Sequence, residues 1–222
     1  MVKRALIYGG SGDLASRFAS QLITSGVQVD VVFRGDAIDD ERVKKYNNVY
    51  IEKSGYSNFE PSVHYDIIFF PQGIFEPMPF VETNAEVLKN EFQVGLLDIM
   101  TLTRKHLDLM KNSIDTGRRV DFAYIGSTSA YAGFKNTAIY CAVKHGLLGF
   151  VRAMNDEYSQ TNIRFWLFSM GSMKNQMGSK LKNQDFNTFL DPDEVAKRIS
   201  NALLAEGNQF EPEIIIKRRF IG

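Results

Sequence analysis

The chain has 222 residues, which suits one well-buried domain and leaves little room for two. It contains 26 lysines and arginines and 26 aspartates and glutamates, so its formal net charge at pH 7 is zero. Proteins that act on nucleic acid usually carry a basic excess, and this balance therefore disfavours a nucleic-acid partner. We expect a single domain over residues 1–222.

Cysteine and histidine usage, together with the apolar segments, indicates the cellular setting. Cys141 is the only cysteine, so no intrachain disulfide is possible, which fits a reducing compartment. No apolar stretch approaches the roughly 18 residues that a membrane helix needs, and the apolar run near the N-terminus is too short for a signal peptide. His64, His106 and His145 are far apart, which argues against a metal site. We expect a cytoplasmic protein without a membrane or metal partner.

Short apolar runs alternate with helix-like segments along the whole chain. Buried parallel strands have this pattern, because both of their faces are covered by helices. The runs are Ala5–Tyr8, Val27–Phe33, Val49–Ile51, Asp66–Phe70, Val120–Ile125, Ile163–Phe168 and Glu213–Ile216. The alternation predicts an α/β fold with a doubly wound parallel sheet of about seven strands and helices on both faces. Ligands of such sheets bind beyond the carboxyl ends of the strands.

The first predicted strand leads directly into a glycine-rich turn, Gly9–Ala15, and a helix pattern follows. Glycines at this place let the backbone approach a diphosphate, whose charge is favoured at a helix N-terminus. A plain tight turn is the alternative. We expect the cofactor contacts of this turn to come from Gly9, Ser11, Gly12, Asp13 and Leu14.

The second predicted strand ends at Phe33-Arg34, 25 positions after Gly9. Folds that prefer NAD usually place an acidic residue near this point, where it accepts hydrogen bonds from the ribose hydroxyls. An arginine would instead pair with a 2′-phosphate, so Arg34 favours NADP(H) over NAD(H). Asp36 would reverse this preference if the strand ended later, and an ordinary solvated charge is the alternative for Arg34.

Two helix starts are marked by capping residues. Thr83-Asn84-Ala85-Glu86 has the pattern of a capping box, which predicts a long helix from there to about Asn112. Asp191-Pro192 suits an N-cap followed by the first helical position of another helix.

Three further residues suggest acid–base chemistry. Tyr140 and Lys144 are four positions apart, so a helix presents them on one face. A lysine ammonium beside a phenol favours the phenolate, and we expect it to lower the pKa of Tyr140 towards working pH. Ser127 lies where the strand over 120–125 closes, in position to hold a reacting oxygen. A helix-surface tyrosine and lysine are the structural alternative.

Together, the glycine turn, Ser127, Tyr140 and Lys144 resemble the short-chain dehydrogenase/reductase family over nearly the whole chain, about Val2 to Ile216. The resemblance implies a Rossmann-like fold and hydride transfer between NADP(H) and a small-molecule carbonyl or alcohol. It implies that Tyr140 is the general acid/base, that Lys144 tunes it and holds the nicotinamide ribose, and that Ser127 bonds the substrate oxygen. By the same analogy Gly73 lies against the cofactor and the protein forms a homodimer or homotetramer.

The sequence departs from the family pattern at several positions. Asp13 and Ala15 replace usual glycines, a variant typical of larger sugar-nucleotide epimerases, which keeps epimerisation as a third reading. After the fourth strand only Gly73 matches the usual asparagine-asparagine-alanine-glycine, and Gly95 stands where a relay asparagine is usual. Asn175 lies close to the position at which the family usually has a threonine. These losses motivate the main alternative, a cofactor-binding scaffold or redox sensor with little or no turnover.

Met170, Met173 and Met177 follow the sixth strand at helix-like spacing. They predict either a short helix packed on the core or an adaptable apolar wall over the substrate.

Overall fold

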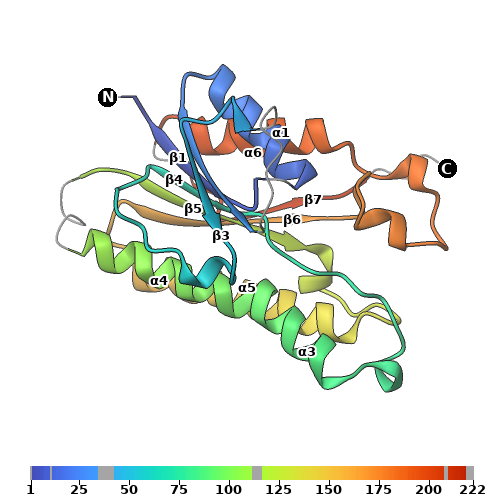
Figure 1. The fold of residues 1–222 in the computed structure, drawn as a ribbon. Helices are drawn as coiled ribbons and strands as arrows, with labels where there is room; N and C mark the ends of the chain where they lie inside the picture. Colours follow the sequence, from blue (N-terminus) through green and yellow to red (C-terminus); the bar gives the residue numbers. More distant parts are fainter. Residues whose placement is uncertain (1, 11, 35–42, 112–116, 208–209, 219–222) are drawn as a thin grey trace.

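The computed structural model describes residues 2–10, 12–34, 43–111, 117–207 and 210–218 (Figure 1). Within these residues, seven strands form one parallel sheet in the order β3-β2-β1-β4-β5-β6-β7. The strands are β1 (Arg4–Tyr8), β2 (Gln28–Arg34), β3 (Asn48–Glu52), β4 (Ile67–Phe70), β5 (Val120–Ser127), β6 (Ile163–Met170) and β7 (Glu213–Ile216). Each predicted apolar run overlaps one of them, so the doubly wound α/β fold is confirmed.

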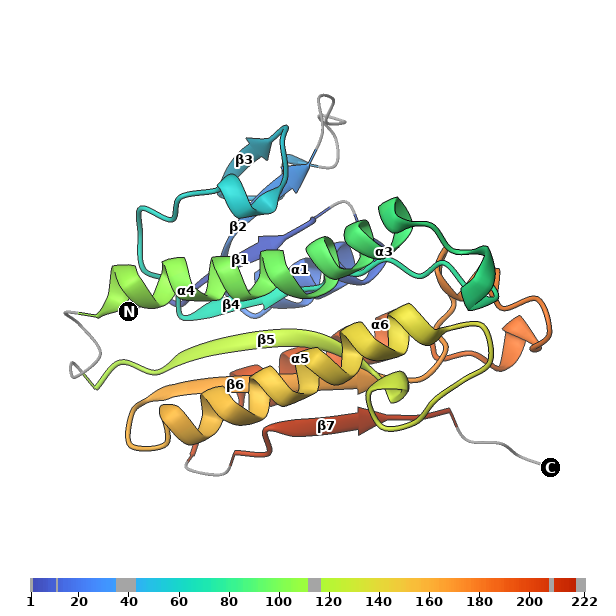
Figure 2. The same cartoon turned by 90° about the horizontal axis from the view of Figure 1, so that it is seen from below.

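Helices cover both faces of the sheet. The five longest described helices are α1 (Asp13–Thr24), α3 (Ala85–Phe92), α4 (Asp98–Met110), α5 (Ala138–Glu157) and α6 (Pro192–Leu204). Helices α1 and α6 pack on one face, and α3, α4 and α5 lie on the other (Figures 1 and 2). No helix in the described ranges combines the length and the apolar character that crossing a bilayer requires.

The strand residues alternate between two hydrophobic cores, one on each face. In β1, Ala5 and Ile7 join the core under α1 and α6, whereas Leu6 and Tyr8 join the core under α4 and α5. All four side chains are fully buried. Since every residue of a central strand enters a core, the strand appears in the sequence as a continuous apolar run.

The long helix predicted after Thr83 is present, but its beginning differs from the prediction. Asn84 is the N-cap, and its side chain accepts a hydrogen bond from the Val87 amide at 2.9 Å. The Thr83 hydroxyl instead donates to the Phe80 carbonyl in the preceding turn, so the capping box is wrong. Five residues of π-helix, Gln93–Leu97, join α3 to α4. Helix α4 ends at Met110, and Asn112 lies outside the described residues.

The start of α6 agrees with its prediction, because Asp191 accepts from the Asp193 amide at 2.8 Å and Pro192 occupies the first turn. The prediction of a short helix that contains the three methionines is wrong. Met170 is the last residue of β6, and Met173 forms an isolated bridge with Leu190. Met173 therefore pairs like a strand residue and is not part of a helix.

Candidate active site

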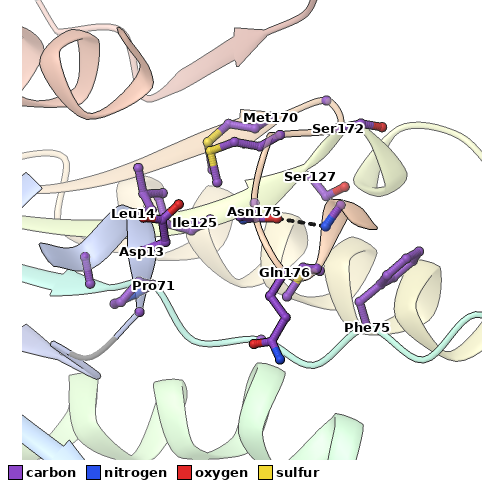
Figure 3. Close-up of a pocket in the computed structure, with 18 of the residues that line it drawn as sticks. Asp13, Leu14, Pro71, Phe75, Ile125, Ser127, Met170, Ser172, Asn175 and Gln176 are labelled. Atoms are coloured by element: carbon purple, nitrogen blue, oxygen red, sulfur yellow. Dashed lines mark hydrogen bonds between the residues drawn. The ribbon is translucent and has the colours of Figure 1, made fainter. Parts of the chain in front are cut away.

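A cavity of about 1030 Å³ opens at the carboxyl ends of the strands, where the strand order reverses between β1 and β4. The residues that line it are Gly10, Gly12–Ser16, Phe33, Lys45, Tyr46, Pro71, Gly73, Phe75, 125–129, Phe134, Lys135, Thr137, Tyr140, 170–173, 175–178, Leu181 and Gln184. Asp13 and Leu14 lie at one end of the cavity and Phe75 at the other, with Ser127 and Asn175 between them (Figure 3). One cavity thus joins the glycine turn to the acid–base residues.

The glycine turn has a local geometry that only glycines permit. Gly9 has a left-handed φ of +78°, and its amide donates to the Val32 carbonyl at 2.8 Å. A Cβ atom at Gly10 would lie 2.1 Å from the Val31 side chain. Gly12 caps α1 without a side-chain hydrogen bond, which leaves the amides of the first turn available to an anion.

Most of the glycine-turn residues expected to contact a cofactor lie at the cavity. Gly12, Asp13 and Leu14 line it, and Gly9 makes the turn just before it. Ser11 lies outside the described residues. This arrangement fits a diphosphate at the N-terminus of α1.

Arg34, the predicted cofactor-selecting residue, ends β2 with an exposed side chain. Its guanidinium lies 6.0 Å from the Tyr56 ring centroid, and it is not among the lining residues. Lys45 does line this end of the cavity, and its ammonium donates to the Ser16 hydroxyl at 2.9 Å and the Ser20 hydroxyl at 3.2 Å. Burial lowers the pKa of Lys45. The sequence reasoning missed this residue, because no motif marks it.

Ser127 and Tyr140 line the middle of the cavity, and Lys144 lies beside Tyr140 without lining the cavity itself. Ser127 is the last residue of β5 and is buried, and its hydroxyl oxygen accepts from the Ser129 amide at 3.1 Å. Tyr140 and Lys144 lie on one face of α5, as predicted, with the ammonium 5.7 Å from the tyrosine ring centroid. Lys144 is 2% exposed and donates to the Ile125 carbonyl at 2.8 Å.

The electrostatics of this group differ from the sequence expectation. Burial raises the pKa of Tyr140 to about 12, and hydrogen bonding to Ser127 opposes that rise only in part. Burial also lowers the pKa of Lys144 to about 8. The predicted fall of the tyrosine pKa is therefore wrong: desolvation is the largest cause of the shift, and the lysine ammonium donates to a backbone carbonyl instead of the phenol.

The segment after β4 supplies two neighbours of this group. Gly73 lies against Lys144, because a Cβ atom at this glycine would be 3.4 Å from the ammonium. Phe75 packs edge-on against the Tyr140 ring with the centroids 4.9 Å apart. Sequence reasoning named Gly73 but missed Phe75, since nothing in the sequence distinguishes it from a core aromatic.

The segment after β6 closes the remaining side. Met170, Met173 and Met177 all line the cavity, while Met170 and Met173 also belong to the core under α6. Asn175 accepts from the Gly178 amide at 2.8 Å, which shapes this segment (Figure 3). The described residues contain no group of three or more histidine, cysteine or acidic side chains that could hold a metal ion.

Gly95, which stands at the place of the expected relay asparagine, lies in the π-helical segment against α5. A Cβ atom there would be 2.6 Å from the Val143 side chain, adjacent to Lys144 in the chain. Any larger side chain must push α5 or its valine aside. The π-helical segment and α5 approach so closely at Gly95 that only a residue without a side chain fits there.

Replacing Gly95 by alanine should therefore destabilise the protein by about 1–3 kcal/mol through overpacking. Gly149 is the matched control, because it lies on α5 and a Cβ atom there would meet nothing within 4 Å. Gly149→Ala should stabilise by about 0.5–1 kcal/mol, since it removes unfolded-state entropy. Urea unfolding measures both, and equal effects of the two changes would contradict the packing explanation.

Comparison with known proteins extends these observations. Residues 13–202 match the family model described as Enoyl-(Acyl carrier protein) reductase. The 3-oxoacyl-[acyl-carrier-protein] reductase FabG of Buchnera aphidicola is 24% identical over 203 residues, which cover 84% of this chain and 80% of the relative. The 3-ketoacyl-(acyl-carrier-protein) reductase of Brucella melitensis, solved in complex with NADH, superposes with a TM-score of 0.82 at 18% identity, covering 96% of each chain. The NADP-bound structure of ElxO gives a TM-score of 0.80 at 17% identity, covering 98% of each chain.

The family model covers most of the chain, and the seven-stranded parallel sheet with its helices matches the solved relatives in fold. The chain belongs to the short-chain dehydrogenase/reductase family of oxidoreductases.

Proposed function

We propose that this protein interconverts a small-molecule carbonyl and an alcohol with NADP(H), using Ser127, Tyr140 and Lys144. The observation that carries the proposal is the single cavity that joins the uncapped N-terminus of α1 to Ser127 and Tyr140. The residues present fit a dinucleotide, because the glycines leave room for a diphosphate and Gly73 leaves room beside Lys144. A bound nicotinamide supplies or accepts the hydride at the carbonyl carbon.

The protein's own residues handle the proton. Tyr140 gives its phenolic proton to the carbonyl oxygen as hydride reaches the carbon, and Ser127 holds that oxygen by a hydrogen bond. A tyrosine whose pKa is near 12 remains protonated at neutral pH, so the resting site is ready to donate. This protonated form is the one that carbonyl reduction requires. Lys144 orients the ribose and assists the return of a proton to the tyrosine.

The cofactor preference rests on two cations, Lys45, which lines the cavity, and Arg34, which ends β2 outside the lining. Arg34 and Lys45 would both favour the 2′-phosphate of NADP(H) over the free hydroxyl of NAD(H). Solved relatives are found with either cofactor, NADP in ElxO and NADH in the Brucella reductase.

Calorimetric titration should give micromolar binding of NADPH and much weaker binding of NADH. Arg34→Ala and Lys45→Met should each weaken NADPH binding by about tenfold, the effect of one lost charged contact, and leave NADH binding unchanged. Arg104→Ala is the matched control, since that arginine is exposed on α4. Tighter NADH binding in the wild type would overturn the NADP(H) preference and leave the reductase proposal intact.

A second candidate is a cofactor-binding scaffold or redox sensor with little turnover. The tight contact of Gly95 with Val143 favours it, because this contact leaves no room for the expected relay asparagine. Tight NADPH binding that alters association with a partner, without oxidation of NADPH across a broad panel of carbonyls, would select this alternative.

The remaining features follow the family analogy. We propose one catalytic domain over residues 1–222, acting in the cytoplasm as a homodimer or homotetramer. Leu97 and Met100 near the start of α4 are 47% and 38% exposed, which suits burial between subunits. The apolar walls formed by Phe75, Met173 and Leu181 favour an apolar substrate. Light scattering of the purified protein measures the assembly.

A further inference from the structure

One peptide bond in the segment after β4 is held at both of its polar atoms. The Phe75 carbonyl accepts a hydrogen bond from the Lys180 ammonium at 2.9 Å. The amide of the next residue, Glu76, donates to the Glu91 carboxylate at 3.3 Å. The carbonyl and the amide of a trans peptide point in opposite directions. Lys180 and Glu91 therefore bind the two opposite edges of the same peptide plane.

The two gripping side chains come from distant parts of the chain. Glu91 is on α3, whereas Lys180 belongs to the segment after β6 and also pairs with the Glu76 side chain at 2.5 Å. Met177, Gly178 and Leu181, which surround Lys180 in the chain, line the cavity. The peptide therefore links the helix layer to the wall opposite the acid–base residues.

Glu91 is a buried carboxylate on α3, where an acidic side chain would usually be exposed to solvent. It is 2% exposed, and its second carboxylate oxygen has no hydrogen-bond partner among the described residues. Burial raises its pKa, the Glu76 carboxylate adds to that rise, and the Lys180 ammonium and the Glu76 amide oppose it. A half-satisfied buried carboxylate costs stability, so a functional reason for it is expected.

The held peptide is connected to the proposed acid through the Phe75 side chain. Phe75, which supplies its carbonyl, is 7% exposed and meets the Tyr140 ring edge-on at an interplanar angle of 73°. A shift of the held segment would carry the Cα atom of Phe75 and its ring with it, and the tyrosine would lose this packing contact.

We propose that Glu91 and Lys180 are positioning residues for Tyr140, which act by clamping the Phe75–Glu76 peptide so that Phe75 fixes the tyrosine ring. This inference rests on the proposed function of Tyr140. Both anchors are needed, because a segment held at only one polar atom can still shift at the other. The clamp also makes the placement of the tyrosine depend on the segment after β6, which forms the substrate side of the cavity.

Steady-state kinetics of the full-length protein, with NADPH and a carbonyl compound that the wild type reduces, tests the clamp. Glu91→Ala and Lys180→Met should each lower kcat by about tenfold, because small misplacements of a catalytic group have effects of this order or larger. Glu91→Gln keeps an oxygen acceptor for the Glu76 amide and should retain kcat within about threefold. Glu86→Gln and Lys182→Met, two exposed positions nearby, are the matched controls and should match the wild type.

Non-additivity gives a second kinetic criterion. The double variant of Glu91→Ala and Lys180→Met should lose no more kcat than the more damaging single variant, because either change already frees the peptide. Multiplying losses would overturn the clamp, and so would wild-type kcat in both single variants. If Glu91→Ala does not fold, Lys180→Met decides, since that side chain is 36% exposed and its loss leaves no buried gap.

Hydrogen exchange separates failure of the clamp from failure of the proposed function. If the wild-type protein reduces no carbonyl, the proposed function fails and kinetics says nothing about Glu91. The exchange rate of the Glu76 amide, followed by NMR, should still rise at least about tenfold in Glu91→Ala and stay near the wild-type rate in Glu91→Gln. Equal protection in all three proteins would overturn the clamp.

Discussion

Replacement of Tyr140 by phenylalanine is expected to lower kcat by about a thousandfold, within the range that a general acid contributes. The change removes one oxygen atom and keeps the ring that packs against Phe75. NADPH affinity should fall by no more than about threefold, the scale of one lost neutral hydrogen bond. Steady-state kinetics and calorimetry on the same preparation measure the two quantities.

Tyr158→Phe is the matched control for that variant. Tyr158 lies at the C-terminal end of the same helix, and its ring packs against Phe165 far from the cavity residues. Wild-type turnover is expected there. If Tyr140→Phe also kept wild-type turnover, the tyrosine would not be the acid, and the scaffold or sensor alternative would gain support.

Lys144→Met is expected to lower kcat by at least about a hundredfold, as loss of a group that assists proton transfer does, and yet to stabilise the fold. Burial lowers the pKa of Lys144 to about 8 from 10.5, which means that folding disfavours its charged form. Methionine removes that cost but also the hydrogen bond to the Ile125 carbonyl. The net gain at pH 7, for protein without added nucleotide, should be about 1–2 kcal/mol.

The stability gain has a defined pH dependence. Below pH 8 the lysine is charged in both the folded and unfolded states, so the burial cost is fully present. Between pH 8 and 10.5 the folded protein loses the proton first, and the wild type becomes more stable as the pH rises. The advantage of methionine should therefore shrink over this window.

Urea unfolding at pH 7 and pH 9.5 measures that window. Lys197→Met, at an exposed position on α6, is the control and should show no such change between the two pH values. A gain for Lys144→Met that is equal at both pH values would show that packing, rather than desolvation of the charge, is its source.

Most of the fold was predictable because it depends on burial. Strands that are covered on both faces are mostly apolar, so runs such as Ile67–Phe70 can be recognised in the sequence. Helix α6 was located by the same kind of local rule, since Asp191 and Pro192 have one plausible arrangement. At α3, Thr83 and Asn84 are both good caps, and the tertiary position of the preceding turn selects the asparagine.

The site was predictable only where a local spacing sets it. Tyr140 and Lys144 share a helix face whatever surrounds them, but the pKa of each depends on burial that only the fold defines. Lys45 and Phe75 reach the cavity from connecting segments, whose course no periodicity determines. Methionine spacing was misleading for the same reason, because Met170 continues a strand and Met173 a bridge.

The cavity is lined partly by a strand and a helix and partly by connecting segments, and this affects how its substrate range could change in evolution. Ser127 ends a fully buried strand and Tyr140 sits on a 20-residue helix, so their separation is set by the sheet and its covering layer. The facing wall, residues 172–184, consists of turns, the bridge at Met173 and one 3₁₀ segment, Gly178–Lys180. Insertions or exchanges in that wall would reshape the substrate space and leave the strand and helix in place. Lys180 is the exception, since a change there reaches the tyrosine. New substrate ranges should therefore arise more readily by variation on either side of Lys180 than at it.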